Sequence, residues 1–265
     1  MTNAKDASAT PSTWLSVGTT GAGKTTLFTT IPGRKFLYVF DPNSPNTIRG
    51  QDIEYETFFP DGLPLTVMPL AETSQDKTFN PALEPRVYPE WEADFEYRLE
   101  SGFFDDFDVI GFDSITTFSD LVMDRILYMN KRPGRWPTEG DWTGAIATMK
   151  NVFRRITAIE EKILYCAGHV EQVKDRKTGA INWQLAMSAH LRVLIPLLFT
   201  EVWLCACEKD ETGYFYTAQT KPDRDHPFLR STLRGILPYE DVTLKDFNHP
   251  EEDGMGRILK EYGAT

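Results

Sequence analysis

SVGTTGAGKTTL, residues 16–27, places Gly18 and Gly23 five positions apart and follows them at once with a lysine and two threonines. Gly18, Gly23, Lys24 and Thr25 match the P-loop spacing G-x-x-x-x-G-K-[ST]. The apolar run before the loop, residues 13–17, predicts a buried strand, and a helix is expected to begin near Lys24. A strand, a glycine-rich turn and a helix in this order indicate a phosphate-binding loop rather than a turn that binds nothing.

The chemistry of this loop is that of an anion cradle. Its glycines let backbone N–H groups turn inward, so that a phosphate chain lies at the positive end of a helix. We expect the whole loop to bind the nucleotide through Gly18, Thr19, Thr20, Gly21, Ala22, Gly23, Lys24, Thr25 and Thr26. The ammonium of Lys24 would lie between the terminal phosphates, and the hydroxyl of Thr25 would bind Mg²⁺.

The length and composition restrict the class of protein. The chain has 265 residues, which is enough for one α/β domain with a sizeable core, and we expect a single domain. No apolar run reaches the roughly 18–20 residues needed to cross a bilayer. The first 13 residues lack the apolar stretch of a secretion signal, so we expect a soluble intracellular protein with no membrane partner.

The cysteines and the net charge exclude further classes. Cys166, Cys205 and Cys207 lie in apolar, strand-like runs, and their spacing matches neither a zinc site nor a disulfide scaffold, so we expect buried reduced thiols. The net charge of −11 argues against a protein that coats nucleic acid by bulk electrostatics. A local basic patch could still bind DNA.

Hydrophobic periodicity predicts the other elements of the chain. We expect a disordered tail at residues 1–12, strands at 35–41, 52–59 and 162–169, helices at 89–104, 119–130, 143–161 and 189–199, a surface excursion at 60–88, a basic loop at 131–142, and a hairpin or loop at 171–182. A β-hairpin is expected from residues 201–208 and 213–220 around the turn at 209–213.

A second nucleotide-site motif lies in FDVIGFDSITTF, residues 107–118, where an apolar run ends in Asp113 and Ser114. This is the form of a Walker B strand, in which the strand is buried between helices and a carboxylate at its carboxyl end faces the P-loop. Asp113 follows the P-loop by about 90 residues, and we expect it to orient water on Mg²⁺.

Two expected motifs of other P-loop classes are missing. A GTPase would show an N-K-x-D guanine reader, but NKRP at residues 130–133 has proline where the aspartate belongs. Transporter ATPases, packaging motors and many helicases place a glutamate directly after the Walker B acid, and here that position holds Ser114.

Four segments resemble those of the RecA superfamily, and more closely those of phage-encoded RecA-like ATPases of the Sak type. They are GTTGAGKTT, KFLYVFDPN, FFDDFDVIGFDSITT and AGHVEQVKD. The resemblance covers residues 13–240, leaving residues 241–265 as a C-terminal extension. It implies an α/β fold with a mostly parallel sheet flanked by helices and a C-terminal β-hairpin. It also implies an ATP- and Mg²⁺-dependent protein that anneals single-stranded DNA, assembles as a homo-oligomeric ring or filament, and acts in a bacterial host cytoplasm.

The same resemblance suggests roles in hydrolysis. The strand between the P-loop and Walker B strands ends in the γ-phosphate sensor, which would be His169 or, as is common in that family, a glutamine, here Gln172. The usual glutamate that polarises water is replaced by Asn43, two residues after Asp41. Asp41 or another acid would then activate water, or hydrolysis would be slow and ATP would act as an assembly switch. Asp41 could equally cap the following loop.

Basic residues supply candidates for contact with a neighbour and with DNA. Lys221, Arg224 and Arg230 would reach a neighbouring subunit's γ-phosphate, or form an ordinary solvated turn. Single-strand binding needs positive charge beside flat groups on which bases stack. The DNA candidates are Lys131, Arg132, Arg135 and Trp136, with Trp142 nearby, and Lys174, Arg176 and Lys177, with Trp183.

Two other functions remain open. The excess of acidic residues and the proline-rich segment at residues 60–88 favour a P-loop switch or loader that acts on a protein partner in replication or packaging. A small-molecule kinase would need an arginine-rich lid, which the sequence lacks.

Overall fold

A computed structural model describes residues 13–60, 84–174, 179, 181–188, 190–211 and 213–263. The expected tail at 1–12 and residues 61–83 of the expected excursion lie outside this range. The strands are β1 (Thr13–Gly18), β2 (Lys35–Val39), β3 (Ile53–Thr57), β4 (Val109–Asp113), β5 (Ile163–Lys174), β6 (Ile181–Leu185), β7 (Glu201–Lys209), β8 (Tyr214–Gln219) and β9 (Tyr239–Asp241). The helices are α1 (Lys24–Thr29), α2 (Ser44–Thr47), α3 (Val87–Glu100), α4 (Ile115–Met129), α5 (Glu139–Ile156), α6 (Leu191–Leu194) and α7 (Gly254–Tyr262).

The strands form one sheet in the order β3-β2-β4-β5-β1-β7-β8-β9, with β6 paired to β5 outside this path. Strands β3, β2, β4, β5, β1 and β7 run parallel to one another, whereas β8 pairs antiparallel with β7 and β9, and β6 pairs antiparallel with β5. The predicted fold class is therefore confirmed: a mostly parallel sheet with flanking helices and a C-terminal β-hairpin. Strand β5 lies between the P-loop strand β1 and the strand β4 that ends in Asp113, which is the order expected for the strand that carries His169.

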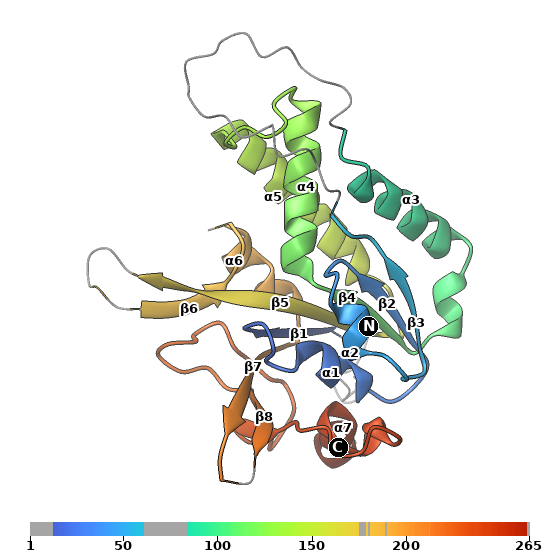
Figure 1. Cartoon of the computed structure of the whole chain (residues 1–265), viewed down its shortest axis with the longest axis vertical. Coiled ribbons are helices and arrows are strands. Elements are labelled where there is room, and N and C mark those ends of the chain that lie inside the picture. The colour runs from blue at the N-terminus through green and yellow to red at the C-terminus, as the bar shows by residue number, and fades with distance from the viewer. Residues whose placement is uncertain are drawn as a thin grey trace, which may run out of the picture.

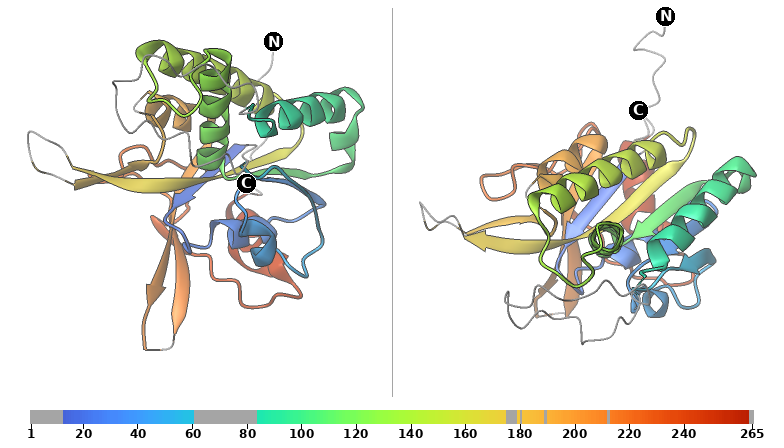
Figure 2. Two further views of the ribbon diagram at one scale, coloured as in Figure 1. Left: turned by 45° about the horizontal axis from the view of Figure 1, so that its top comes forward. Right: turned by 90° about the horizontal axis from the view of Figure 1, so that it is seen from above.

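Helices cover both faces of the sheet (Figures 1 and 2). Helices α3, α4 and α5 pack on one face, where Trp91, Phe118 and Phe153 join the core. Helices α1 and α7 pack on the other face through residues such as Phe28 and Ile258. The central strands are uninterrupted apolar runs because both of their faces are buried. Along the described part of the chain, no helix has the length and apolar composition needed to cross a membrane.

Three predictions from the sequence were wrong in detail. Helix α5 begins at Glu139 rather than near residue 143, because Thr138 and Asp141 form a capping box at its first turn. The helix expected at 189–199 is only the short α6, followed by a 3₁₀ turn at Pro196–Leu198, since proline lacks the N–H that would continue an α-helix. Cys207 is exposed, because the outer half of β7 extends beyond the body of the sheet, whereas Cys166 and Cys205 are buried as expected.

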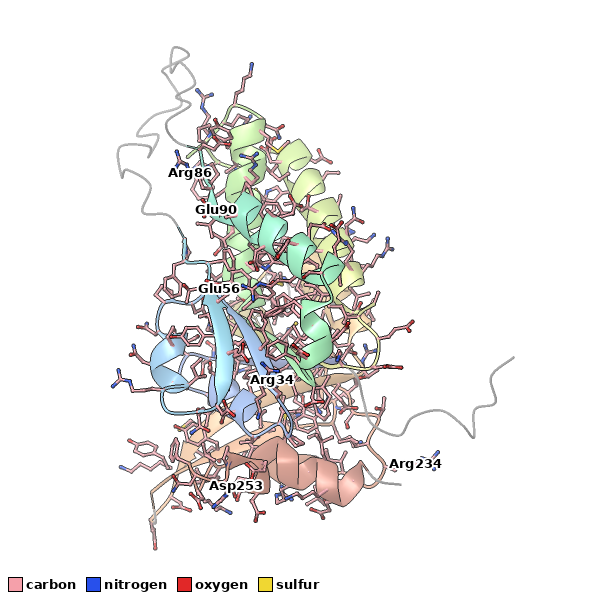
Figure 3. The ribbon with its side chains drawn as sticks, turned by 90° about the vertical axis from the view of Figure 1, so that its right-hand side faces the viewer. Arg34, Glu56, Arg86, Glu90, Arg234 and Asp253 are labelled. Carbon is pink, nitrogen blue, oxygen red and sulfur yellow. The ribbon has the colours of Figure 1, made fainter. Side chains whose placement is uncertain are left out.

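The C-terminal residues pack against the P-loop helix. The predicted boundary between residues 240 and 241 falls inside β9, which pairs with β8. The backbone N–H of Met255 donates to Thr30 Oγ1 over 2.9 Å, which ties the start of α7 to the end of α1. Figure 3 shows Asp253 beside α7 and Glu90 on α3, with the strands between them. Residues 241–263 are thus part of the packing that holds α1 in place.

The centre of β4 is too crowded for a side chain at Gly111. A Cβ there would lie 2.5 Å from Leu37 Cδ1 and 2.7 Å from Phe28 Cε2. We therefore expect Gly111→Ala to lower the free energy of unfolding by about 1–3 kcal/mol through overpacking. Guanidinium denaturation would measure the change.

The matched control is Gly140→Ala on the exposed first turn of α5, where a Cβ would have no neighbouring atom closer than 4.0 Å. This control should be neutral or slightly stabilising, since alanine favours helix. Equal denaturation midpoints for the two variants would contradict the packing assigned to β4.

Candidate nucleotide-binding site

A cavity of about 500 Å³ lies at the carboxyl ends of the central strands. Its size is within the usual range for small-molecule sites. It brings together the residues to which the sequence analysis gave catalytic or metal-binding roles, namely Lys24, Thr25, Asp41, Asp113 and His169. They come from α1, from the ends of β2 and β4, and from β5 where it passes the end of β1, so the parallel sheet gathers residues that are far apart in the chain.

The P-loop has the backbone that its glycines predict. Gly21 and Gly23 have φ values of +80° and +85°, in the left-handed region that glycine adopts without strain. Gly23 lies directly before α1, so the N-terminus of that helix faces the cavity. Of the nine loop residues predicted to contact nucleotide, those that line the cavity are Thr20, Gly21, Gly23, Lys24, Thr25 and Thr26.

The other three loop residues support the turn. Gly18 lies so close to β7 that a Cβ on it would be 2.6 Å from the carbonyl oxygen of Cys205. The carbonyl oxygen of Thr19 accepts from Ala22 N over 3.2 Å. Lys24 Nζ donates to the carbonyl oxygens of Gly18 and Thr19 over 3.0 and 2.8 Å. Burial lowers the pKa of Lys24, and nearby groups that include the Asp113 carboxylate oppose this effect.

Asp113 meets two hydroxyl groups at the bottom of the cavity. Thr25 Oγ1 donates to Asp113 Oδ2 over 2.6 Å, and Ser44 Oγ donates to the same oxygen over 2.8 Å. Burial raises the pKa of Asp113, while the hydrogen bond from Thr25 acts in the opposite direction. The structure thus places the Walker B acid directly beside the hydroxyl that the sequence assigned to magnesium.

These oxygens fit a magnesium ion that is bound together with a nucleotide. Mg²⁺ prefers oxygen ligands, and in phosphate sites it takes one or two from the protein and the rest from phosphates and water. Thr25 and Asp113 supply ligands of this kind beside a phosphate-binding loop. No group of three or more His, Cys, Asp or Glu residues that could hold a metal by itself occurs in the part of the chain that the structure describes.

Asp41 and His169 form a second polar pair in the cavity. His169 Nε2 lies 3.0 Å from Asp41 Oδ2, and Thr117 Oγ1 donates to Asp41 Oδ1. Burial favours the protonated form of Asp41, but the hydrogen bonds from His169 and Thr117 outweigh it, so the pKa of this carboxyl lies below its ordinary value. The side chain of Asp41 therefore joins β5 and α4.

The two sensor candidates lie in different places. His169 lines the cavity, and its backbone N–H donates to Thr116 Oγ1 over 2.9 Å. Gln172 is exposed on the hairpin formed by β5 and β6, where it pairs with Trp183. The geometry therefore puts His169, and not Gln172, next to the phosphate-binding loop.

The predicted neighbour-contacting residues lie in two environments. Arg230 is partly buried, and its guanidinium donates to the carbonyl oxygens of Pro196, over 2.6 Å, and Phe199. It therefore holds its own chain together. Arg224 is exposed and Lys221 partly exposed, on the segment after β8.

The DNA candidates also differ in what surrounds them. Trp136 is 84% exposed on the turn between α4 and α5, beside Arg135. Arg132 on the same turn donates to the carbonyl oxygen of Trp136 over 2.8 Å and lies 3.5 Å from Asp141, so it stabilises the turn. Lys131 is exposed there, and Lys174 is exposed at the end of β5. Arg176 and Lys177 lie outside the described residues.

Sequence reasoning missed four side chains of the site. Ser44 and Thr117 bond the two aspartates, the Tyr165 hydroxyl donates to Lys24 O over 2.6 Å, and Tyr216 lines the cavity. The only local signal was the position of Ser44 and Thr117 shortly after strand-ending acids. Nothing near Tyr165 or Tyr216 in the sequence indicates the P-loop, because each approaches it from another strand.

The buried negative charge of Asp113 affects the free energy of unfolding, and this effect can be measured. Because its pKa is raised in the folded state, the free energy of unfolding falls as the pH rises from the ordinary pKa of a carboxyl group to the raised one, and it stays lower above that range. We expect Asp113→Asn to stabilise the nucleotide-free protein at pH 7 by on the order of 1 kcal/mol and to abolish its stabilisation by Mg²⁺ and ATP. The gain should disappear in acid, where the wild-type carboxyl is protonated. Thermal unfolding at both pH values, with and without ligand, measures both effects.

Asp106→Asn, at an exposed carboxyl outside the cavity, is the control and should change neither quantity. A variant at Asp113 that is less stable than wild type at pH 7 would show that its hydrogen bonds outweigh its buried charge.

Comparison with known proteins places this site in a family. A family model described as AAA domain matches residues 10–227. Among solved structures, one similar chain is the flagellar accessory protein FlaH from Methanocaldococcus jannaschii, at 12% sequence identity and a TM-score of 0.39, with 89% of this chain and 87% of that chain covered. No curated protein matches the sequence. Since the matched residues span most of the chain and include the whole cavity, the chain belongs to the AAA domain family.

Proposed function

We propose that this protein is a Mg²⁺-dependent ATPase of the RecA-like class that binds single-stranded DNA and promotes annealing or recombination in phage DNA metabolism. The observation that carries the proposal is the cavity in which Lys24, Thr25 and Asp113 meet the pair formed by Asp41 and His169. Membership of the AAA domain family supports nucleotide binding. The position of β5 between β1 and β4 supports the RecA-like class.

Five side chains of the cavity have tasks in hydrolysis, namely Lys24, Thr25, Asp41, Asp113 and His169. Bound Mg²⁺ would supply positive charge to the phosphates, held by Thr25 and Asp113. Lys24 binds the terminal phosphates, and His169 contacts the γ-phosphate. The lowered pKa of Asp41 makes its carboxylate a weak base, so it orients water well but accepts a proton poorly. This favours slow hydrolysis, in which ATP acts mainly as an assembly switch.

The charges in the cavity favour an assembly of several copies. Among the described residues that line it, the basic ones are Lys24 and His169, and they share the space with two aspartates. A triphosphate there gains from a further cation during phosphoryl transfer. We propose that Lys221 or Arg224 of a second copy supplies it in a ring or filament. Arg230 is bonded within its own chain and is the weaker candidate.

Two regions combine positive charge with an aromatic ring, as the binding of single-stranded DNA requires. The turn between α4 and α5 presents Trp136 beside Lys131 and Arg135. The hairpin of β5 and β6 projects from the body in Figure 1, and Trp183 on it lines a second cavity of about 570 Å³ together with Arg224. With a net charge of −11, the DNA contact must be confined to such local patches.

A protein partner is the alternative target. The net charge of −11 favours a P-loop switch or loader that recruits a replication or packaging protein, with the same nucleotide site. A pull-down after nuclease treatment separates the two, since a loader keeps its protein partner and a DNA-binding protein loses material that was bridged by DNA. In both cases we propose that the protein is phage-encoded and acts in the host cytoplasm.

The role of Asp41 can be tested by its amide. Asp41→Asn keeps the shape of the side chain but removes the charge that faces His169. We expect ATP turnover to fall about 100-fold, because the neutral amide loses its charged contact with His169 and holds the attacking water less firmly, with little change in nucleotide affinity. Phosphate release and equilibrium binding measure the two quantities, with Asp106→Asn as control. Unchanged turnover would assign Asp41 a structural role.

Coupling between nucleotide and DNA tests the whole proposal. We expect a non-hydrolysable ATP analogue to raise the affinity for a labelled single-stranded oligonucleotide at least about fivefold. Lys24→Ala should abolish this increase, whereas Lys260→Ala, at an exposed lysine of α7, should not. Fluorescence anisotropy at low salt measures the effect. Absence of DNA binding together with an ATPase rate that DNA does not change would exclude the DNA proposal.

A further inference from the structure

Among the described residues that line the nucleotide cavity, Tyr216 is the one Phe, Tyr or Trp side chain. It lies on β8, in the hairpin with β7 that extends from the body in Figure 1. Its ring rests on the P-loop, because a Cβ added to Gly23 would lie 2.7 Å from Tyr216 Cδ1. The P-loop therefore has an aromatic surface packed against the residue that precedes α1.

The sheet order decides which end of a nucleotide would meet this ring. Asp41, Asp113 and His169 come from β2, β4 and β5, which all lie on one side of β1. Tyr216 approaches from the other side, through β7 and β8. A triphosphate whose metal-bound end lies at Asp113 thus directs its nucleoside away from β4 and toward Tyr216.

The ring is part of a fixed platform. The backbone N–H of Tyr216 donates to Thr243 Oγ1 over 2.9 Å, and its carbonyl accepts from Val242 N over 2.8 Å. On the other edge of β8, Tyr216 is paired with Cys207. Because its backbone is bonded on both edges of the strand, Tyr216 is held in place before a nucleotide binds. Stacking of a base on its ring therefore costs little conformational entropy.

Outside its phosphate-binding end, which holds Lys24, Asp41, Asp113 and His169, the cavity is lined by described residues that carry no charge. Of these, Thr20 of the P-loop and Thr26 of α1 bear hydroxyls, each of which can donate or accept. Such hydroxyls suit an exocyclic amine and an exocyclic carbonyl equally. Selection at this end therefore depends on stacking area, which is greater for purines than for pyrimidines.

We propose that Tyr216 is the base-stacking residue of the site and that it selects purine nucleoside triphosphates over pyrimidine ones without separating adenine from guanine. The inference rests on the proposed nucleotide binding. It makes the β7–β8 hairpin part of the binding site, although no sequence motif connects this hairpin to the P-loop.

Calorimetric binding of five ligands with Mg²⁺ tests the proposal, the ligands being ATP, GTP, CTP, UTP and inorganic tripolyphosphate. In the wild-type protein we expect ATP and GTP to bind with similar affinity, and CTP and UTP about tenfold more weakly. Tyr216→Ala should weaken ATP and GTP binding about tenfold and remove the purine preference. Binding of tripolyphosphate, which has no base, should be unchanged and shows that the P-loop is intact.

Two further variants serve as controls. Tyr216→Phe keeps the ring and should keep the purine preference. Tyr214→Ala removes a ring from the same face of the same strand, two residues away and 68% exposed, and should leave all five affinities unchanged.

Several outcomes would overturn the inference while nucleotide binding stands. Equal wild-type affinity for purines and pyrimidines, or an unchanged ATP affinity in Tyr216→Ala, excludes stacking on this ring. A marked preference for ATP over GTP would show that the site distinguishes adenine from guanine. Loss of tripolyphosphate binding in Tyr216→Ala reassigns the ring to support of Gly23. If the wild-type protein binds none of the five ligands, the proposed function itself is excluded.

Discussion

Two hydroxyl groups from separate helices meet one carboxylate oxygen at the centre of the molecule. Thr25 on α1 and Ser44 on α2 both donate to Oδ2 of Asp113, at the end of β4. A buried carboxylate is tolerated only where donors satisfy it, so the sheet and the two helices must be placed to within hydrogen-bonding distance. The same constraint leaves the oxygens of Thr25 and Asp113 side by side, where a metal with oxygen ligands can be held.

The sheet order explains why the site has two different ends. The P-loop strand β1 is flanked by β5 and β7, and each of these strands runs on into an antiparallel hairpin. His169 lies on β5 and faces the acidic end of the cavity, whereas Tyr216 reaches the P-loop from the hairpin of β7 and β8. The two hairpins that project from the body are thus physically connected to the two ends of the cavity.

Agreement between sequence and structure is closest where the evidence is local. The P-loop spacing, the apolar strands and the placement of Asp113 could be read directly, since buried parallel strands and tight glycine turns need particular residues at particular spacings. Reasoning from the local sequence is insufficient where contacts with a distant segment determine the environment of a side chain. Cys207 lies in an apolar run but is exposed, because β7 leaves the body of the sheet there. The guanidinium of Arg230, a candidate for contact with a neighbouring subunit, is bonded to carbonyl groups near α6, a contact that the local sequence does not indicate.

From the order of residues alone, one can deduce a phosphate-binding loop, a Walker B acid and a mostly parallel α/β fold, because each depends on short-range spacing and side-chain polarity. Only the folded chain shows that Asp41 bonds His169, that Ser44 shares Asp113 with Thr25, and that Tyr216 lies on Gly23. The first two contacts join residues 128 and 69 positions apart, and no local pattern encodes them. They exist because parallel strands place their carboxyl ends at one edge of the sheet, where distant segments meet.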